Sequence, residues 1–207
     1  METVTTFFGI DPSLRSTGLA CLRVGGGSAN IVVGSIQVKD KAGSWPGIYA
    51  VSSKQYEELG DFIGCHWCPE SGPVFGIMEH PIPSQRPGPC FVAGALLAHS
   101  FKAHVGKDPV FIHPEWLGKL CGIKRVEKDQ VREFVAEIIS LNGIGTFRLR
   151  GDSRERILPE GLEFDESDAS LYTLFLAFGR GYVTKLPPGL NAESWTLELK
   201  HVEKVDR

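Results

Sequence analysis

The sequence predicts an α/β protein built on a five-stranded mixed sheet that is flanked by helices. Three apolar segments, residues 3–10, 16–24 and 30–38, follow one another through short connections, which indicates an antiparallel meander. Two further buried strands, residues 73–79 and 109–112, come later, with helical segments between them. Strands that are joined through helices pair in parallel, so we expect the sheet to contain both kinds of pairing.

Four segments have the composition and apolar spacing of helices: residues 49–63, 91–105, 127–141 and 165–178. Between the last two, residues 143–163 are polar and rich in Arg and Gly, which is typical of a mobile loop. The length favours one domain over residues 1–186. Residues 187–207 form a tail without a clear period, which we expect to add a strand or to remain loose.

The composition is that of a soluble globular protein, with 42% hydrophobic and 23% charged residues. No apolar run is long enough to span a membrane, and the N-terminus lacks the features of a secretory signal, so we expect an intracellular location and no membrane contact. The five cysteines are an odd number, which argues against a disulfide framework. Only Cys65 and Cys68 have ligand-like spacing, and a pair of loop thiols is the simpler interpretation than zinc or redox chemistry.

Four carboxylates stand at positions where they can meet. Asp11 ends the first strand and Glu79 ends the fourth, while Asp165 and Asp168 lie three residues apart at the start of the last helix, on one face of its first turn. Taken singly, each has an ordinary explanation as a turn residue, a solvated acid or a helix cap. If the first and fourth strands are neighbours, all four side chains converge.

Converging carboxylates repel one another unless cations neutralise them. Hard oxygen ligands suit Mg²⁺ or Mn²⁺. Two such ions about 4 Å apart activate a water and stabilise the leaving oxygen of a phosphodiester. The pattern therefore predicts a metal-dependent nuclease.

Four motifs resemble those of the RuvC Holliday-junction resolvases. Residues 8–18, Phe-Gly-Ile-Asp-Pro-Ser-Leu-Arg-Ser-Thr-Gly, resemble the opening of that family, whose first strand ends in a catalytic Asp-Pro. Residues 77–79, Ile-Met-Glu, are similar to its second acid, and residues 165–169, Asp-Glu-Ser-Asp-Ala, to the D-x-x-D-A of its last helix. Residues 127–131 resemble a segment whose lysine faces the junction. The resemblance covers residues 7–180, in the same order.

This resemblance implies an RNase H-like fold and a homodimer whose paired active sites nick two strands symmetrically. It implies Asp11, Glu79, Asp165 and Asp168 as catalytic ligands of Mg²⁺ or Mn²⁺, two ions per site, with Glu166 as an alternative to Asp165. Lys128 would lie near the scissile phosphate. The family occurs in bacteria, phages and organelles, so the cytoplasm of a bacterial or phage-infected host, or an organelle nucleoid, is the expected location.

The net charge of −3 does not indicate a nucleic-acid-binding protein, but residues 100–156 carry 11 Lys and Arg against 8 Asp and Glu. A solvated surface is the ordinary explanation of such basic runs. Beside the acids we interpret them as contacts to four-way or branched DNA. The DNA-binding candidates fall into two basic runs. The first contains Lys119, Lys124, Arg125, Lys128 and Arg132, and the second contains Arg148 and Arg150, followed by Arg154 and Arg156.

Three other residues have two interpretations each. Phe91 and Trp116 are either core anchors or wedges at an opened junction centre, and His80 is either a satisfied strand-end histidine or a contact to the attacking water. Other functions remain open on the same fold: a nuclease for RNA–DNA hybrids or branched replication intermediates, or a catalytically silent nucleic-acid-binding protein. An actin-like phosphotransferase is excluded, because it needs two such domains and Gly-rich phosphate loops.

Overall fold

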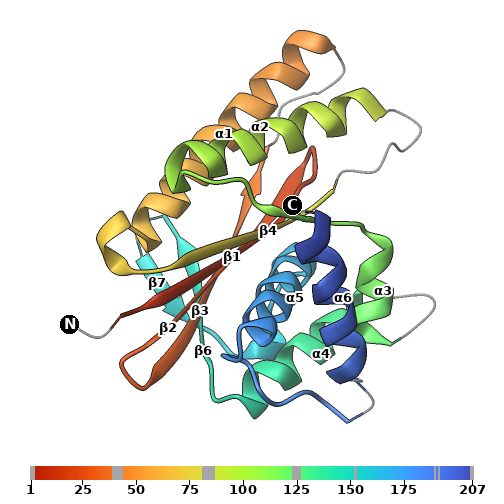
Figure 1. The fold of residues 1–207 in the computed structure, drawn as a ribbon. Coiled ribbons are helices and arrows are strands. Elements are labelled where there is room, and N and C mark those ends of the chain that lie inside the picture. Colours follow the sequence, from red (N-terminus) through yellow and green to blue (C-terminus); the bar gives the residue numbers. More distant parts are fainter. Residues whose placement is uncertain are drawn as a thin grey trace.

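The computed structural model describes residues 3–38, 44–80, 87–122, 127–151, 153–188, 190 and 192–205. Within them a seven-stranded sheet runs through the middle of the molecule, with helices on both faces (Figure 1). The strand order is β5-β4-β1-β2-β3-β6-β7. The predicted α/β class with a mixed sheet is confirmed, although the sheet has seven strands where five were expected.

The first three strands form the predicted antiparallel meander. Strand β1 (Thr5–Asp11) pairs with β2 (Ser16–Gly25), and β2 pairs with β3 (Ser28–Gln37). The turn between β2 and β3 contains Gly26 and Gly27, whose φ angles are 61° and 71°. A two-residue hairpin with positive φ at both positions matches the twist of its strands, and glycine adopts this conformation without strain.

Two parallel strands extend the sheet on the other side of β1. Strand β4 (Val74–Glu79) lies parallel to β1, and β5 (Val110–Ile112) lies parallel to β4. The last pair of the β1–β4 ladder is Ile10 with Met78. The next residue of each strand is an acid, so the parallel chain direction alone places two carboxylates side by side at the C-terminal ends of these strands.

Residues 143–163 do not form the loop that their composition predicts. Strand β6 (Gly145–Arg150) adds in parallel to β3, and β7 (Ser153–Arg156) closes a hairpin with it. Backbone groups at the free edge of β3 supply the hydrogen bonds that a polar sequence needs to become a strand. Polar residues are tolerated because this edge of the sheet is partly exposed to solvent.

The helices divide into two layers (Figure 1). Helices α1 (Trp45–His66) and α2 (Pro87–Val105) pack against each other on one face of the sheet. The other layer consists of α3 (Glu115–Cys121), α4 (Lys128–Leu141), α5 (Phe164–Gly179) and α6 (Ala192–Val205). Two short 3₁₀ helices, Pro69–Ser71 and Pro159–Gly161, lie in connections. All four expected helices form, and α3 and α6 are additions.

Each layer of helices encloses a separate apolar core. Successive side chains of a strand point to opposite faces. Phe7 therefore belongs to the core beneath α5, whereas Phe8 and Ile10 belong to the core beneath α1 and α2. Burial on both faces explains why β1 is apolar throughout.

The tail forms neither a strand nor a loose segment, because α6 packs on the α5 layer. Trp195 is fully buried, with its ring edge-on to Phe175 and Phe178 at 5.4 and 5.3 Å between centroids. Its indole N–H donates a 2.8 Å hydrogen bond to the carbonyl of Leu120. Among the described residues, none of the helices combines the length and apolar character needed to cross a membrane.

Candidate active site

Asp11 and Glu79 terminate adjacent parallel strands, and both are half-buried. Asp11 also closes the β1–β2 ladder, where it lies opposite Gly18. By strand alternation Asp11 lies on the same face as Phe7, which is the face that α5 covers. The C-terminal ends of β1 and β4 therefore present these two acids to the first turns of α5.

Two glycines let α5 approach the sheet closely enough to bring Asp165 and Asp168 to the same place. A side chain on Gly18 would overlap the backbone carbonyl of Asp165, and one on Gly9 would overlap the carbonyl of Ala169. Neither the helix backbone nor the central strands can shift easily. The absence of a Cβ at these two positions therefore sets the distance between the helix and the strand-end acids.

The four carboxylates, which we call the acid cluster (Asp11, Glu79, Asp165 and Asp168), are electrostatically coupled. Burial raises the pKa of Asp11 well above its usual range, and the charges of the other three acids raise it further. Burial also raises the pKa of Asp168 to about 7, with Glu79 and Asp165 adding to the effect and Lys128 opposing it. The structure thus brings together the four acids on which the sequence argument depended.

Tyr172 is a member of the site that the sequence analysis missed. Its hydroxyl donates a hydrogen bond to Oε2 of Glu79. Burial raises the pKa of Glu79, and this hydrogen bond lowers it in part. Asp165, Asp168 and Tyr172 follow at intervals of three and four residues, the spacing of one helix face, which is the signal that was available in the sequence.

Lys128 is the cation at the rim of the acid cluster. It is the first residue of α4, and its Nζ lies 3.7 Å from Oδ1 of Asp165. Its side chain is 61% exposed, so the ammonium group remains accessible to a ligand. Lys128 and Arg132 also stand over the ring of Phe164, at 5.7 and 5.4 Å from its centroid, which ties the start of α4 to the start of α5.

Glu166 faces away from the acid cluster and forms a buried ion pair. Arg148 Nε and Nη2 donate hydrogen bonds of 2.8 and 2.7 Å to its two carboxylate oxygens. Arg148 also donates to the carbonyl of Gly161, and Glu166 accepts from the backbone N–H of Glu163. This pair joins β6 to the start of α5, so Glu166 does not replace Asp165 as a member of the cluster.

The loop after Asp11 is fixed by side chains from two elements. Thr17 Oγ1 donates to the carbonyl of Ser13, and the amide of the buried Gln55 in α1 donates to that same carbonyl at 2.6 Å and to Thr17 Oγ1 at 3.1 Å. These contacts hold the Asp-Pro turn rigidly at the sheet edge. Gln55 was not singled out in the sequence, where it is one polar residue of an amphipathic helix.

The donor chemistry of the acid cluster suits a hard divalent cation, because neighbouring carboxylates raise the pKa values of Asp11 and Asp168, and a positive charge between them would stabilise their ionised forms. In the part of the chain that is described, however, no three His, Cys, Asp or Glu side chains are close enough together to ligate one ion. Glu79 is held by Tyr172 and Asp165 by Lys128. A cation would have to draw these side chains inward. Cys65 and Cys68 are free and exposed.

The predicted DNA-binding residues have different surroundings. Lys119 is exposed on α3, while Arg150 is exposed on β6 and pairs with Glu155 at 3.3 Å. Arg132 pairs with Asp129 at 2.7 Å on α4. Arg148 is engaged by Glu166, and its side chain is only 14% exposed. Lys124 and Arg125 lie outside the described residues, as does the side chain of Trp116.

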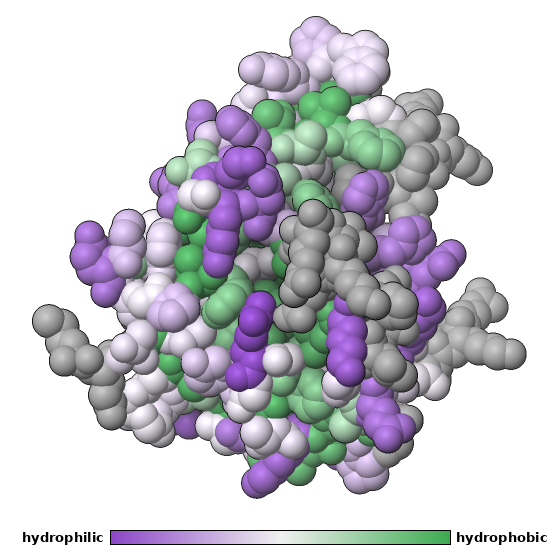
Figure 2. Space-filling model, in the orientation of Figure 1, coloured by the Kyte–Doolittle hydropathy of each residue, from purple (hydrophilic) through white to green (hydrophobic). Residues whose placement is uncertain are grey.

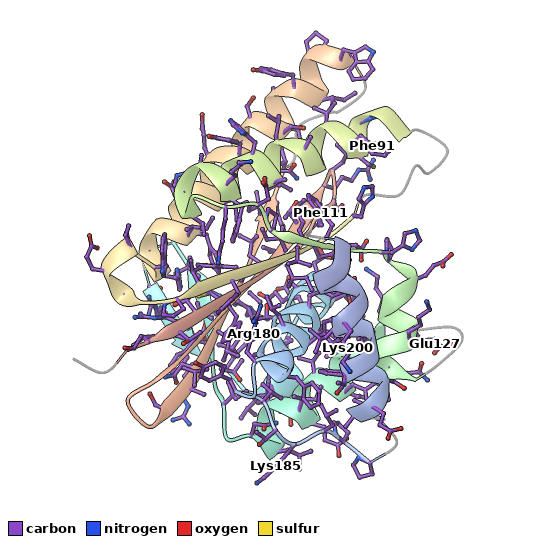
Figure 3. All side chains as sticks on the ribbon, in the orientation of Figure 1. Phe91, Phe111, Glu127, Arg180, Lys185 and Lys200 are labelled. Atoms are coloured by element: carbon purple, nitrogen blue, oxygen red, sulfur yellow. The ribbon has the colours of Figure 1, made fainter. Side chains whose placement is uncertain are left out.

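An aromatic group borders the site on the α2 side. The ring of His80 lies between Phe91 and Phe111, with 5.9 Å between centroids in each case. Figure 3 shows the two phenylalanines on the same side of the molecule, and in Figure 2 hydrophobic residues reach the surface in this upper part of the view. His80 therefore packs between the two rings. His113, one residue beyond β5, lowers the pKa of Glu79 and was not anticipated.

Comparison with solved structures identifies the fold as RNase H-like. The chain is similar to Thermus thermophilus RuvC in complex with a Holliday junction substrate, with a TM-score of 0.54 and 13% sequence identity over 88% of this chain and 99% of that one. It is also similar to a second structure of T. thermophilus RuvC (TM-score 0.49, 15% identity, the same coverage). No protein-family model and no curated protein matches the sequence. At this identity the likeness concerns the fold.

Proposed function

We propose that this protein is a homodimeric DNA endonuclease that resolves four-way junctions by paired symmetric nicks, with Mg²⁺ or Mn²⁺ at the acid cluster. The observation that carries the proposal is the meeting of Asp11 and Glu79, at adjacent strand ends, with Asp165 and Asp168 on α5. The likeness to RuvC in complex with junction DNA supports the choice of substrate.

The residues of the site have separate proposed roles in metal binding, orientation and phosphate binding. The four acids would hold two divalent ions, which supply Lewis-acid stabilisation and an activated water for phosphodiester hydrolysis. Tyr172 orients Glu79 through its hydrogen bond. The exposed ammonium of Lys128 stands 3.7 Å from Asp165 and is available to a non-bridging oxygen of the scissile phosphate.

Binding of branched DNA is proposed to rest on backbone phosphates. The net charge is −3, so only locally basic surfaces can attract the duplex. Lys119, Lys128 and Arg150 are exposed and lie on three separate elements. Two copies of such a surface in a homodimer would recognise the shape of a junction rather than a base sequence.

The test compares an end-labelled immobile four-way junction with a linear duplex of the same sequence, each incubated with Mg²⁺ and either wild type or Asp11→Asn. We expect paired nicks at symmetric positions in the junction alone. Asp11→Asn should abolish cleavage while binding persists, because only a carboxylate that holds the cation is lost. Lys54→Gln, an exposed change on α1, is the control and should cut at the wild-type rate.

Equal cutting of the duplex, or an intact junction in both Mg²⁺ and Mn²⁺, would contradict the resolvase proposal. Cleavage of an RNA–DNA hybrid by wild type, but not by Asp11→Asn, would keep the acid cluster as a nuclease site and change its substrate.

A further inference from the structure

A pocket lies on the opposite face of the sheet from the acid cluster. We call it the Arg23–Arg154 pocket; it has a volume of about 310 Å³, and its lining includes Arg23, Asn30, Val32, Phe147 and Arg154. Arg23 pairs with Thr6 in the β1–β2 ladder and faces the α1 layer, five residues along β2 from the Gly18 that pairs with Asp11. At about 3.4 Å per residue the two sites are separated by roughly 17 Å.

The two arginines of this pocket have no anionic partner in the part of the chain that the structure describes. Among the described residues neither Arg23 nor Arg154 forms an ion pair, and Nε of Arg23 is buried without a hydrogen-bond partner. Arg154 has one long hydrogen bond, of 3.4 Å, to the carbonyl of Cys65. Two guanidinium groups thus line one pocket without a counter-charge among the described residues, and a bound anion would supply that charge.

His66, at the end of α1, does not line the pocket but lies close enough to feel the charges of both arginines. It is 2% exposed, its Nδ1 is 2.8 Å from the carbonyl of Phe62, and its Nε2 is buried without a partner. Burial, together with the charges of Arg154 and Arg23, lowers the pKa of His66 to about 4. The ring is therefore neutral at pH 7, and Nδ1–H donates to Phe62, which leaves Nε2 as an acceptor.

The remaining lining combines the flat ring of Phe147 and aliphatic groups with the polar side chains of Ser28 and Asn30. Phe147 and Val32 are neighbours in the β3–β6 ladder and face the pocket, and the side-chain amide of Asn30 offers both a donor and an acceptor. Two guanidinium groups match the terminal oxygens of a phosphate dianion better than those of one carboxylate. The volume lies at the lower end of the range of small-molecule sites, which suits a mononucleotide.

We propose that the Arg23–Arg154 pocket binds a small phosphomonoester with a flat apolar body, of the chemical class of the nucleoside monophosphates. The phosphate lies between the two guanidinium groups, and the base lies against Phe147 within reach of Asn30. This site is separate from the acid cluster and does not depend on the nuclease proposal.

The experiment is calorimetric titration of the full chain with AMP, adenosine, inorganic phosphate and a 5′-phosphorylated single-stranded oligonucleotide. We expect saturable binding of AMP to the wild type. Adenosine should bind the wild type at least tenfold more weakly than AMP does, and the Arg23→Gln and Arg154→Gln variants should bind AMP at least tenfold more weakly than the wild type does. Each change removes charge-assisted hydrogen bonds to the phosphate. The control Lys54→Gln removes the same charge from the exposed side of α1 and should bind AMP as wild type does. Amide NMR shifts of Asn30 and Phe147 should report the same titration.

Absence of saturable AMP binding at millimolar concentrations would overturn the proposal, as would AMP binding that both arginine variants retain. Binding of the oligonucleotide without AMP binding would make the pocket a nucleic-acid contact and would also overturn it. Thermal unfolding of each variant checks its fold. Arg154 is exposed, so Arg154→Gln carries the test if Arg23→Gln does not fold.

Discussion

The hydroxyl of Tyr172 in α5 donates a hydrogen bond to the carboxylate of Glu79 at the end of β4. The two residues are 93 positions apart in the chain, and Tyr172 lies one helical turn after Asp168. The bond therefore connects the strand-end acids with the helix that carries the other two. It also holds one carboxylate oxygen of Glu79 in a defined direction before any ligand arrives.

The first prediction concerns Tyr172→Phe. Loss of one buried hydrogen bond should lower the free energy of unfolding by about 1 kcal/mol. Without this bond the carboxylate of Glu79 loses its fixed orientation. The Mg²⁺ concentration needed for half-maximal junction cleavage should therefore rise severalfold. The matched control is Tyr182→Phe, which removes a hydroxyl 2.9 Å from Thr5 Oγ1, away from the acid cluster. An unchanged Mg²⁺ requirement in Tyr172→Phe would show that the bond is structural only.

The second prediction concerns stability and pH in the absence of divalent ions. Burial raises the pKa of Asp168 from 3.8 to about 7, so the folded protein binds more protons than the unfolded chain between these values. Stability should therefore fall as the pH rises from about 4 to 7. The shift corresponds to a contribution of at most about 4 kcal/mol.

Asp168→Asn should reduce this dependence, with the remainder coming from the raised pKa values of Asp11 and Glu79, and it should be more stable than wild type at pH 7. Urea unfolding at pH 4.5 and 7.5 with EDTA measures it, and Asp61→Asn on the exposed side of α1 is the control. The assigned pKa shift would be refuted if the stability of the wild type rose between these two pH values and the stability of Asp168→Asn rose by the same amount.

The third prediction separates two roles of Arg148. Arg148→Met leaves the buried carboxylate of Glu166 without its partner, which should cost about 3–5 kcal/mol of stability. Arg150→Met breaks an exposed pair and should cost less than about 1 kcal/mol. The double variant Arg148→Met/Glu166→Gln should recover part of the loss. Weaker DNA binding at unchanged stability in Arg148→Met would instead make Arg148 a phosphate contact.

The fourth prediction concerns the C-terminal helix. Trp195→Ala should lower the free energy of unfolding by about 3–5 kcal/mol, because it empties a fully buried aromatic site. Thr196→Ala, at an exposed position of the same helix, should change it by less than about 0.5 kcal/mol. Chemical denaturation of both variants measures the difference. A small effect of Trp195→Ala would mean that α6 contributes little to the fold.

The elements with a strong apolar period were predictable, and those without one were not. Strand β1 is buried on both faces, and α4 has a clear apolar side, so both could be read from local sequence. Strands β6 and β7 have little apolar pattern, because their stability comes from pairing at the edge of β3. Helix α6 depends on few apolar side chains, chiefly Trp195, whose partners lie on α5 and α3.

The same division holds for the candidate site. Local sequence is enough to place two acids at strand ends and two on one helix face, because chain direction and helical period are local properties. The residues that stand beside these acids depend on long-range packing. It turned Glu166 toward Arg148, placed Tyr172 on Glu79, and brought Asp165 against Gly18. These contacts join residues that are far apart in the chain, and close packing of α5 on the sheet determines them.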